Sequence, residues 1–111
     1  MQNDFIDGAL GTKEAQAIVH EVRSVINGFC GDVYFTRDTH YDNYLKTQEG
    51  INLPIEHCIE GSEGHKIVPA IFNAPKCETE TILKSTFGSY ELCSLIGKFI
   101  SYGCSIDEIV L

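Results

Sequence analysis

Two histidines and two carboxylates stand in one polar segment, and together they could bind a divalent metal. Asp38 and His40 are two residues apart, and Glu49 and His57 follow further along the same segment. Carboxylate oxygens and neutral imidazole nitrogens are ligands that suit Zn, Mn or Fe in proteins. The alternative is structural, in which Asp38 and His40 cap a turn and the other two side chains face solvent. The residue types alone leave both interpretations open.

A lysine at the end of an apolar run is the second candidate. Lys84 follows Ile82 and Leu83, and its ammonium group could pair with a carboxylate or stabilise a thiolate. The alternative is a lysine that leaves a strand and enters water. The sequence alone favours that simpler role.

Other reactive side chains give weaker signals. His57 and Cys58 are adjacent, but neighbouring side chains in an extended segment point in opposite directions. We therefore do not expect them to act as a base and a nucleophile. His20 and His65 have no evident partner, and we expect both to face solvent.

The composition is that of one globular domain. The chain has 111 residues, of which 43% are hydrophobic and 22% are charged. Its net charge of -8 opposes binding to phosphate backbones and to anionic lipid. No apolar run approaches the roughly 20 residues that cross a bilayer, and the N-terminus lacks the pattern of a secretory signal. We expect a cytoplasmic protein that binds neither nucleic acid nor membranes.

The cysteines predict a reducing compartment. Their number is odd, and they lack the clustered spacing of a structural zinc site. We expect free thiols, most of them buried as small apolar side chains. The five are Cys30, Cys58, Cys77, Cys93 and Cys104.

Alternating helices and strands must position the candidate residues. Apolar residues at helical spacing predict the helices, and short β-branched or aromatic runs predict the strands. Thr12 and Ser89 are the expected N-caps of the two helices. The expected elements, in chain order, are a helix over 12–27, a strand over 33–36, a polar loop over 37–66, a strand over 79–84, a helix between Ser89 and Gly103, and a strand over 106–111.

This order of elements is typical of an α/β fold with a mainly parallel sheet. Active sites in such sheets gather at the carboxyl ends of the strands. The sequence opens on a polar turn with no strand before it and closes on the apolar beginning of a strand. We therefore expect one incomplete domain over 1–111, without its first strand and without its C-terminal part.

Four segments resemble motifs of the isochorismatase-like cysteine hydrolases, the superfamily that includes nicotinamidases. They occur in the family's order and span nearly the whole chain, which makes the resemblance more specific than any one motif. They are Met1-Gln2-Asn3-Asp4-Phe5-Ile6-Asp7-Gly8-Ala9-Leu10 (the first turn), Thr36-Arg37-Asp38-Thr39-His40 (the metal loop), Leu53-Pro54-Ile55-Glu56-His57-Cys58-Ile59-Glu60-Gly61-Ser62 (the His-Cys segment, with Ser62 for Thr) and Lys84-Ser85-Thr86-Phe87-Gly88-Ser89 (the lysine segment).

The resemblance implies a three-layer, Rossmann-like α/β/α fold and a catalytic triad of Asp, Lys and Cys. In this family a cysteine attacks an amide carbonyl, and water hydrolyses the acyl-enzyme. Lys84 matches the family's lysine. The family's aspartate would precede Met1 and its cysteine would follow Leu111, so Asp4 and the five cysteines do not match these positions. We expect the complete protein to be active and this chain alone to be inactive and marginally stable.

The resemblance also implies ligands. Asp38, His40, Glu49 and His57 match the positions at which nicotinamidases hold one divalent metal (Zn, Mn or Fe), which binds the pyridine nitrogen of nicotinamide. No organic cofactor is implied. Phe5 resembles an aromatic residue that lines the substrate pocket, although a core role is equally consistent.

Two functions are therefore expected as alternatives. The first is a hydrolase that cleaves a C–N amide bond of a small molecule, nicotinamidase-like, and that assembles as a homo-oligomer when full length. The second is a non-catalytic module of the same fold that binds a small molecule or a metal.

Overall fold

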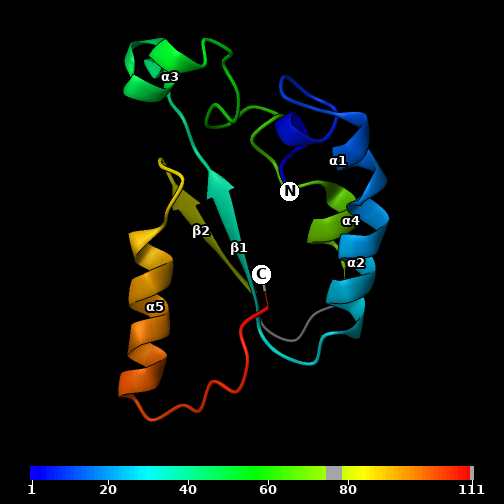
Figure 1. Cartoon of the computed structure of the whole chain (residues 1–111), viewed down its shortest axis with the longest axis vertical. Coiled ribbons are helices and arrows are strands. Elements are labelled where there is room, and N and C mark those ends of the chain that lie inside the picture. The colour runs from blue at the N-terminus through cyan, green and yellow to red at the C-terminus, as the bar shows by residue number, and fades with distance from the viewer. Residues whose placement is uncertain (75–78, 111) are drawn as a thin grey trace.

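The computed structural model describes residues 1–74 and 79–110, in which helices lie on both sides of two parallel strands. Figure 1 shows α5 (Tyr90–Ser101) on one side of the strands and α2 (Val19–Gly28) with α4 (Pro69–Phe72) on the other. The strands are β1 (Val33–Asp38) and β2 (Thr79–Lys84). The remaining helical segments are η1 (Asn3–Phe5), α1 (Lys13–Ala17), η2 (Tyr44–Lys46) and α3 (Gln48–Asn52). The predicted α/β fold with parallel strands is confirmed.

The register of the two strands decides which residues meet at their ends. The strands pair in parallel from Val33 opposite Thr79 to Asp38 opposite Lys84. Their carboxyl ends therefore coincide, and the polar residues that end them become neighbours.

The hydrophobic core lies between β1 and the helices α2 and α4. Phe35 points from β1 into this core, and its neighbour Tyr34 lies near Phe99 of α5, with ring centroids 6.1 Å apart. This alternation follows from the opposite directions of successive side chains in a strand. The buried core residues are Ile26, Phe35, Ile67, Ile71 and Ala74.

Both predicted N-caps are confirmed, and each stands at the beginning of a helix. The Thr12 hydroxyl accepts a hydrogen bond of 3.0 Å from the backbone N–H of Ala15, and the Ser89 hydroxyl accepts one of 3.1 Å from Leu92. The first helix differs from the prediction, because Ile18 interrupts it and separates α1 from α2. No helix of the described residues is long and apolar enough to cross a membrane.

The strand predicted over 106–111 is wrong for the residues that the structure describes. Residues 104–110 have no regular secondary structure and are exposed, and Leu111 lies outside the described residues. An apolar run becomes a strand only when a neighbouring strand pairs with it, and β1 pairs here with β2.

The burial of the cysteines also differs from the prediction. Cys58 is buried, whereas Cys30, Cys93 and Cys104 are exposed, and Cys77 lies outside the described residues. Cys93 is exposed because it lies on α5, none of whose residues is fully buried.

Candidate metal centre and catalytic lysine

The ends of the two strands join the candidate lysine to the candidate metal ligands. Because Asp38 lies opposite Lys84, the Lys84 ammonium group donates a 3.2 Å hydrogen bond to Asp38 Oδ1 and one of 3.0 Å to the Thr86 carbonyl. Both side chains of the pair are largely buried, with 16% of Lys84 and 12% of Asp38 exposed. The alternative of a lysine that enters water is therefore excluded.

A short parallel bridge brings the two histidines together. The backbone N–H of His40 donates to the Cys58 carbonyl at 3.0 Å, and the N–H of Glu60 donates to the His40 carbonyl at 2.8 Å. This pairing continues beyond the end of β1 and places the segment with His57 alongside His40. Both histidines are buried.

Helix α3 carries Glu49 to the same place. Thr47 caps this helix, since its hydroxyl accepts a 3.0 Å hydrogen bond from the Gly50 N–H and donates one of 2.7 Å to the Tyr44 carbonyl. A side chain at Gly50 would collide with the backbone carbonyl of Tyr44, so glycine allows the helix to approach η2 closely. Cap and glycine together fix the position of Glu49.

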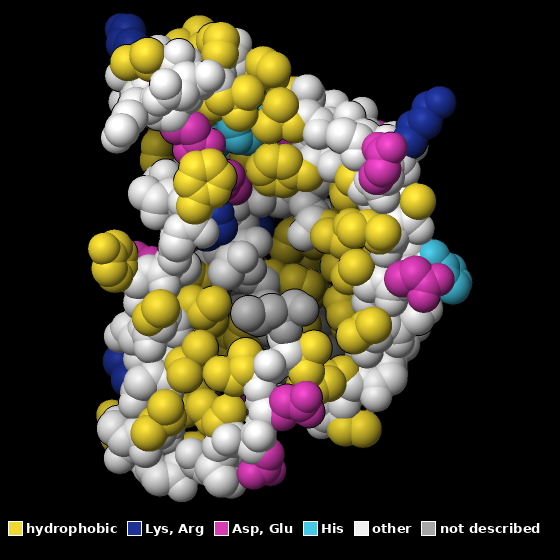
Figure 2. Space-filling view, viewed as in Figure 1, with side chains coloured by type: hydrophobic (Ala, Val, Ile, Leu, Met, Phe, Trp, Pro, Cys, Tyr) yellow, Lys and Arg dark blue, Asp and Glu magenta, His cyan; other side chains and the backbone are white. Residues whose placement is uncertain are grey.

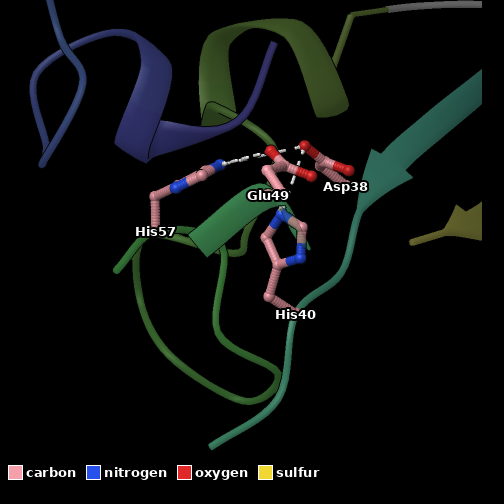
Figure 3. Close-up of side chains that lie close together, drawn as sticks. All are labelled: Asp38, His40, Glu49 and His57. Atoms are coloured by element: carbon pink, nitrogen blue, oxygen red, sulfur yellow. Dashed lines mark ion pairs between the residues drawn. The ribbon is translucent and has the colours of Figure 1, made fainter. Parts of the chain in front are cut away.

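The four predicted metal ligands converge, as Figure 3 shows, so that one atom of each lies within 4.8 Å of the others. His40 Nε2 lies 3.6 Å from Asp38 Oδ2 and 3.8 Å from Glu49 Oε1. His57 Nε2 lies 4.0 Å from Asp38 Oδ2 and 3.7 Å from Glu49 Oε1. Two ligands bound to zinc at its usual bond lengths in tetrahedral geometry stand about 3.4 Å apart. The four histidine–carboxylate distances come within a few tenths of an ångström of this value, and the widest separation in the set, up to 4.8 Å, would have to shorten further for one metal to bind all four.

The hydrogen bonding of the two histidines fits a metal. His40 Nε2 is buried and has no hydrogen-bond partner, which is costly for a polar atom unless something else occupies its lone pair. His57 donates from Nδ1 to the Ile55 carbonyl at 2.8 Å, so its neutral ring keeps the Nε2 lone pair for the cluster. Metal-binding histidines commonly hold their other nitrogen in this way.

Aromatic rings fix the orientation of the imidazoles. Tyr44 is fully buried, with its ring centroid 4.7 Å from that of His40 and 5.1 Å from that of His57. Burial, and next the charges of Glu49 and Asp38, raise the pKa of Tyr44 above its ordinary value. Phe5 contacts His57 edge to face, with ring centroids 5.5 Å apart. Tyr44 could not be predicted as part of the site, because an aromatic residue in a polar segment carries no signal of its own.

Cys58 lies next to the cluster but is unsuited to nucleophilic attack. Burial, followed by the charges of Asp4 and Asp38, raises the pKa of the Cys58 thiol to about 12. The thiol therefore stays protonated near neutral pH, whereas the thiolate is the reactive form. Asp4 is occupied as well, since its Oδ2 accepts a 2.7 Å hydrogen bond from the Cys58 N–H.

The prediction that His65 faces solvent is wrong. His65 is buried, its Nδ1 lies 2.8 Å from the Arg37 guanidinium and its Nε2 lies 2.9 Å from the Thr39 hydroxyl. Burial, and next the charge of Arg37, lower the pKa of His65. The partners flank Asp38 in sequence but lie far from His65 along the chain, so no local pattern announces them. His20 is exposed as predicted.

An open pocket of about 250 Å³ lies beside the lysine. Its lining residues come from the segment that follows β1, from the end of β2 and the turn after it, and from the beginning of α5. They are Thr39, Tyr41, Leu83, Lys84, Ser85, Thr86, Gly88, Tyr90 and Glu91. The pocket gives a small molecule access to the neighbourhood of Lys84.

The fold is similar to that of a solved structure. N-carbamoylsarcosine amidase from Thermoplasma acidophilum matches with a TM-score of 0.67 and 25% sequence identity over 93% of this chain. The chain spans 58% of the length of that structure. A scan of protein-family models finds no match. A search of curated proteins finds none either.

The fold and the site now define a class. Two parallel strands lie between helices, and Lys84 ends one of them. Asp38 ends the other and joins three further metal-ligand side chains. These features accompany the four sequence motifs. The structural match is to an amidase, and the chain is isochorismatase-like in fold.

Proposed function

We propose that the complete protein is a cysteine hydrolase that cleaves a C–N amide bond of a small molecule. In this proposal, the present chain supplies the metal centre and the lysine. The observation that carries it is the contact between Lys84 and Asp38, which joins the lysine to the metal ligands beside an open pocket. The likeness to an amidase structure supports the same reaction class.

The reaction has two steps. A cysteine thiolate attacks the amide carbonyl carbon, a C–S bond forms, and the C–N bond breaks as the amine leaves with a proton from an acid group. Water then attacks the thioester, releases the carboxylic acid and restores the thiol. A positive charge near the sulfur favours the thiolate, and Lys84 is the group of this chain that we assign to that role.

The metal and the aromatic residue would act on the substrate. Asp38, His40, Glu49 and His57 would hold a divalent ion such as Zn, Mn or Fe, which supplies a Lewis acid for a basic atom of the substrate. Phe5, packed against His57, would contact the substrate on that side of the metal centre. Nicotinamide is the substrate to test first, because its ring nitrogen suits such an ion.

We further propose that this chain alone does not turn over amides. The Cys58 thiol has a pKa of about 12, and no cysteine of the chain matches the family's nucleophile by position. Incubation of the purified chain with nicotinamide and N-carbamoylsarcosine, followed by detection of ammonia, should give no product above buffer. Turnover that Lys84→Ala abolishes would overturn this expectation.

Metal binding tests the site directly. The chain, stripped with a chelator and titrated with Zn²⁺ or Co²⁺, should bind one equivalent. His57→Ala should weaken binding more than about 100-fold. This exceeds the loss expected when a residue that only hydrogen-bonds to a metal ligand is replaced. His20→Ala is the matched control, because His20 is exposed on α2 and should leave binding unchanged. Equal affinities in the three proteins, or the lack of stoichiometric metal, would overturn the metal centre.

A non-catalytic module that binds a metal or a small molecule is the second candidate function. The observation that favours it is a complete set of ligand side chains in a chain whose buried cysteine is a poor nucleophile. Amide turnover by the full-length protein would exclude it, whereas metal binding without turnover by that protein would support it.

The protein's surroundings complete the proposal. The exposed thiols of Cys93 and Cys104 are free, which suits the reducing cytoplasm. We also propose that the full-length protein assembles as a homo-oligomer, which size-exclusion chromatography with light scattering would test.

A further inference from the structure

Asp38 ends β1, and its backbone needs partners on the side away from β2. The N–H of Thr39 donates to the Lys84 carbonyl at 2.8 Å, so Thr39 directs its backbone toward β2. Successive residues of a strand direct their N–H and C=O groups to opposite edges. The N–H and C=O of Asp38 therefore face the other edge of the strand, where buried polar groups must find partners.

The side chain of Gln2 supplies both partners. The Asp38 N–H donates to Gln2 Oε1 at 2.7 Å, and Gln2 Nε2 donates to the Asp38 carbonyl at 2.8 Å. The second hydrogen of Nε2 is donated to the His65 carbonyl at 2.9 Å. With 3% of its surface exposed, Gln2 uses both hydrogens and the oxygen of its amide inside the protein. The Gln2 amide thus takes the place of the backbone N–H and C=O groups that a neighbouring strand would offer to Asp38.

The carboxylate of Asp38 lies between Lys84 and the two histidines of the metal cluster. Asp38 Oδ1 accepts from Lys84, and Oδ2 lies 3.6 Å from His40 Nε2 and 4.0 Å from His57 Nε2. A small rotation of the Asp38 backbone would move both oxygens relative to these three groups. The position of the carboxylate thus depends on what holds the backbone.

We propose that Gln2 is a positioning residue for Asp38, acting through the Asp38 backbone to set the geometry of the metal ligands and of the Lys84 pair. The part that concerns the metal rests on the function proposed above. The effect on the Asp38 carboxylate does not require a bound metal.

The neighbour Asn3 offers a matched control. Its side-chain amide donates to the Glu63 carbonyl at 2.8 Å, in the same turn of the chain, and no contact joins it to the described metal ligands. Gln2→Met and Asn3→Leu each replace an amide by an apolar group of similar shape. Both variants lose hydrogen bonds between the first turn and residues 63–65, but only Gln2→Met loses those to Asp38.

Cobalt binding is the first measurement, since the visible spectrum of Co²⁺ reports ligand geometry. Gln2→Met should weaken Co²⁺ binding at least about tenfold and shift the visible bands, as expected for a partner that orients a ligand. Asn3→Leu should stay within about threefold of the wild type, with unchanged bands. Equal losses in the two variants, or wild-type binding by Gln2→Met, would overturn the proposal.

The carboxyl carbon of Asp38 gives a reading that needs no metal. In the chelator-treated protein, the ¹³Cγ signal of Asp38 should move in Gln2→Met and not in Asn3→Leu. If the wild type binds no Co²⁺, the metal centre fails and this signal decides on Gln2. A signal that stays in place, or that moves equally in both variants, overturns the proposal. If Gln2→Met does not fold, Gln2→Asn replaces it under the same criteria, because its shorter amide cannot reach both backbone groups of Asp38.

Discussion

The cluster corner and the α5 side of this molecule are built in different ways. The cluster corner is formed by the end of β1, η2, α3 and the segment around His57. There, buried or partly buried polar side chains are held by hydrogen bonds to nearby backbone groups. On the α5 side, formed by α5 and residues 104–110, no described residue is fully buried. Figure 2 shows hydrophobic side chains gathered on the face over α5.

The difference shows what fixes a site in this fold. Each candidate ligand has its own local support, such as the Thr47 cap for Glu49 and the Ile55 carbonyl for His57. These supports are directional, so they define atomic positions, whereas apolar contacts mainly define proximity. We infer that the cluster corner keeps its geometry largely independently of α5. Three predictions compare a buried part of the molecule with the α5 side, and a fourth concerns the buried His65.

The largest expected effect is stabilisation of the chain by metal. A ligand that binds the folded state alone raises the free energy of unfolding by about 4 kcal/mol when its free concentration is 1,000 times Kd. Urea unfolding with and without Zn²⁺ should show this gain in the wild type and in Ile100→Ala on the α5 side. His40→Ala should lose it, because the buried Nε2 no longer contributes a ligand. If Zn²⁺ no longer stabilises Ile100→Ala, the two regions are coupled.

Truncations of isoleucine compare the core with the α5 side. Ile71 of α4 is 1% exposed, and Ile71→Ala should lower the free energy of unfolding by about 3 kcal/mol through lost burial and a cavity. Ile100 is 63% exposed, and the same truncation there should change it by no more than about 0.5 kcal/mol. Similar losses at both positions, measured by urea unfolding, would mean that Ile100 is buried in solution.

The sequence predicted both strands of the sheet and the four side chains that converge, but it missed α3 and α4, and the strand that it predicted over 106–111 is wrong for the described residues. Strand β2 has the predicted bounds, and the caps Thr12 and Ser89 are confirmed, because these features depend on neighbouring residues. The family motifs, rather than the spacing of the residues along the chain, suggested that the four metal-ligand side chains converge. The roles of Gln2 and His65 were not predictable, since their partners lie far away along the chain.

The dependence of stability on pH should report the buried His65. Its folded pKa is lowered, so between the folded and unfolded values the unfolded chain binds more protons. Stability is therefore complete above the unfolded value near 6.5 and falls as the pH decreases through that range, by at most about 1.4 kcal/mol per pH unit for one proton.

The variant His65→Gln isolates this contribution. It removes the titrating ring, while the other histidines are shared with the wild type. Urea unfolding of the metal-free proteins between pH 7.5 and 5.0 should show a smaller decrease in the variant. Parallel curves would mean that protonation of His65 does not oppose folding, despite the Arg37 guanidinium 2.8 Å from Nδ1.

The smallest effects compare one capping bond in each region. Thr47→Ala and Ser89→Ala each remove a hydroxyl that accepts from a backbone N–H at the beginning of a helix, and each should cost about 1 kcal/mol of stability. Their effects on the site should differ, because α3 carries Glu49 and α5 carries no metal ligand. Thr47→Ala should weaken Co²⁺ binding several-fold, and Ser89→Ala should leave it unchanged. If the two variants weaken it equally, the site depends on overall stability, and the cluster corner has no geometry of its own.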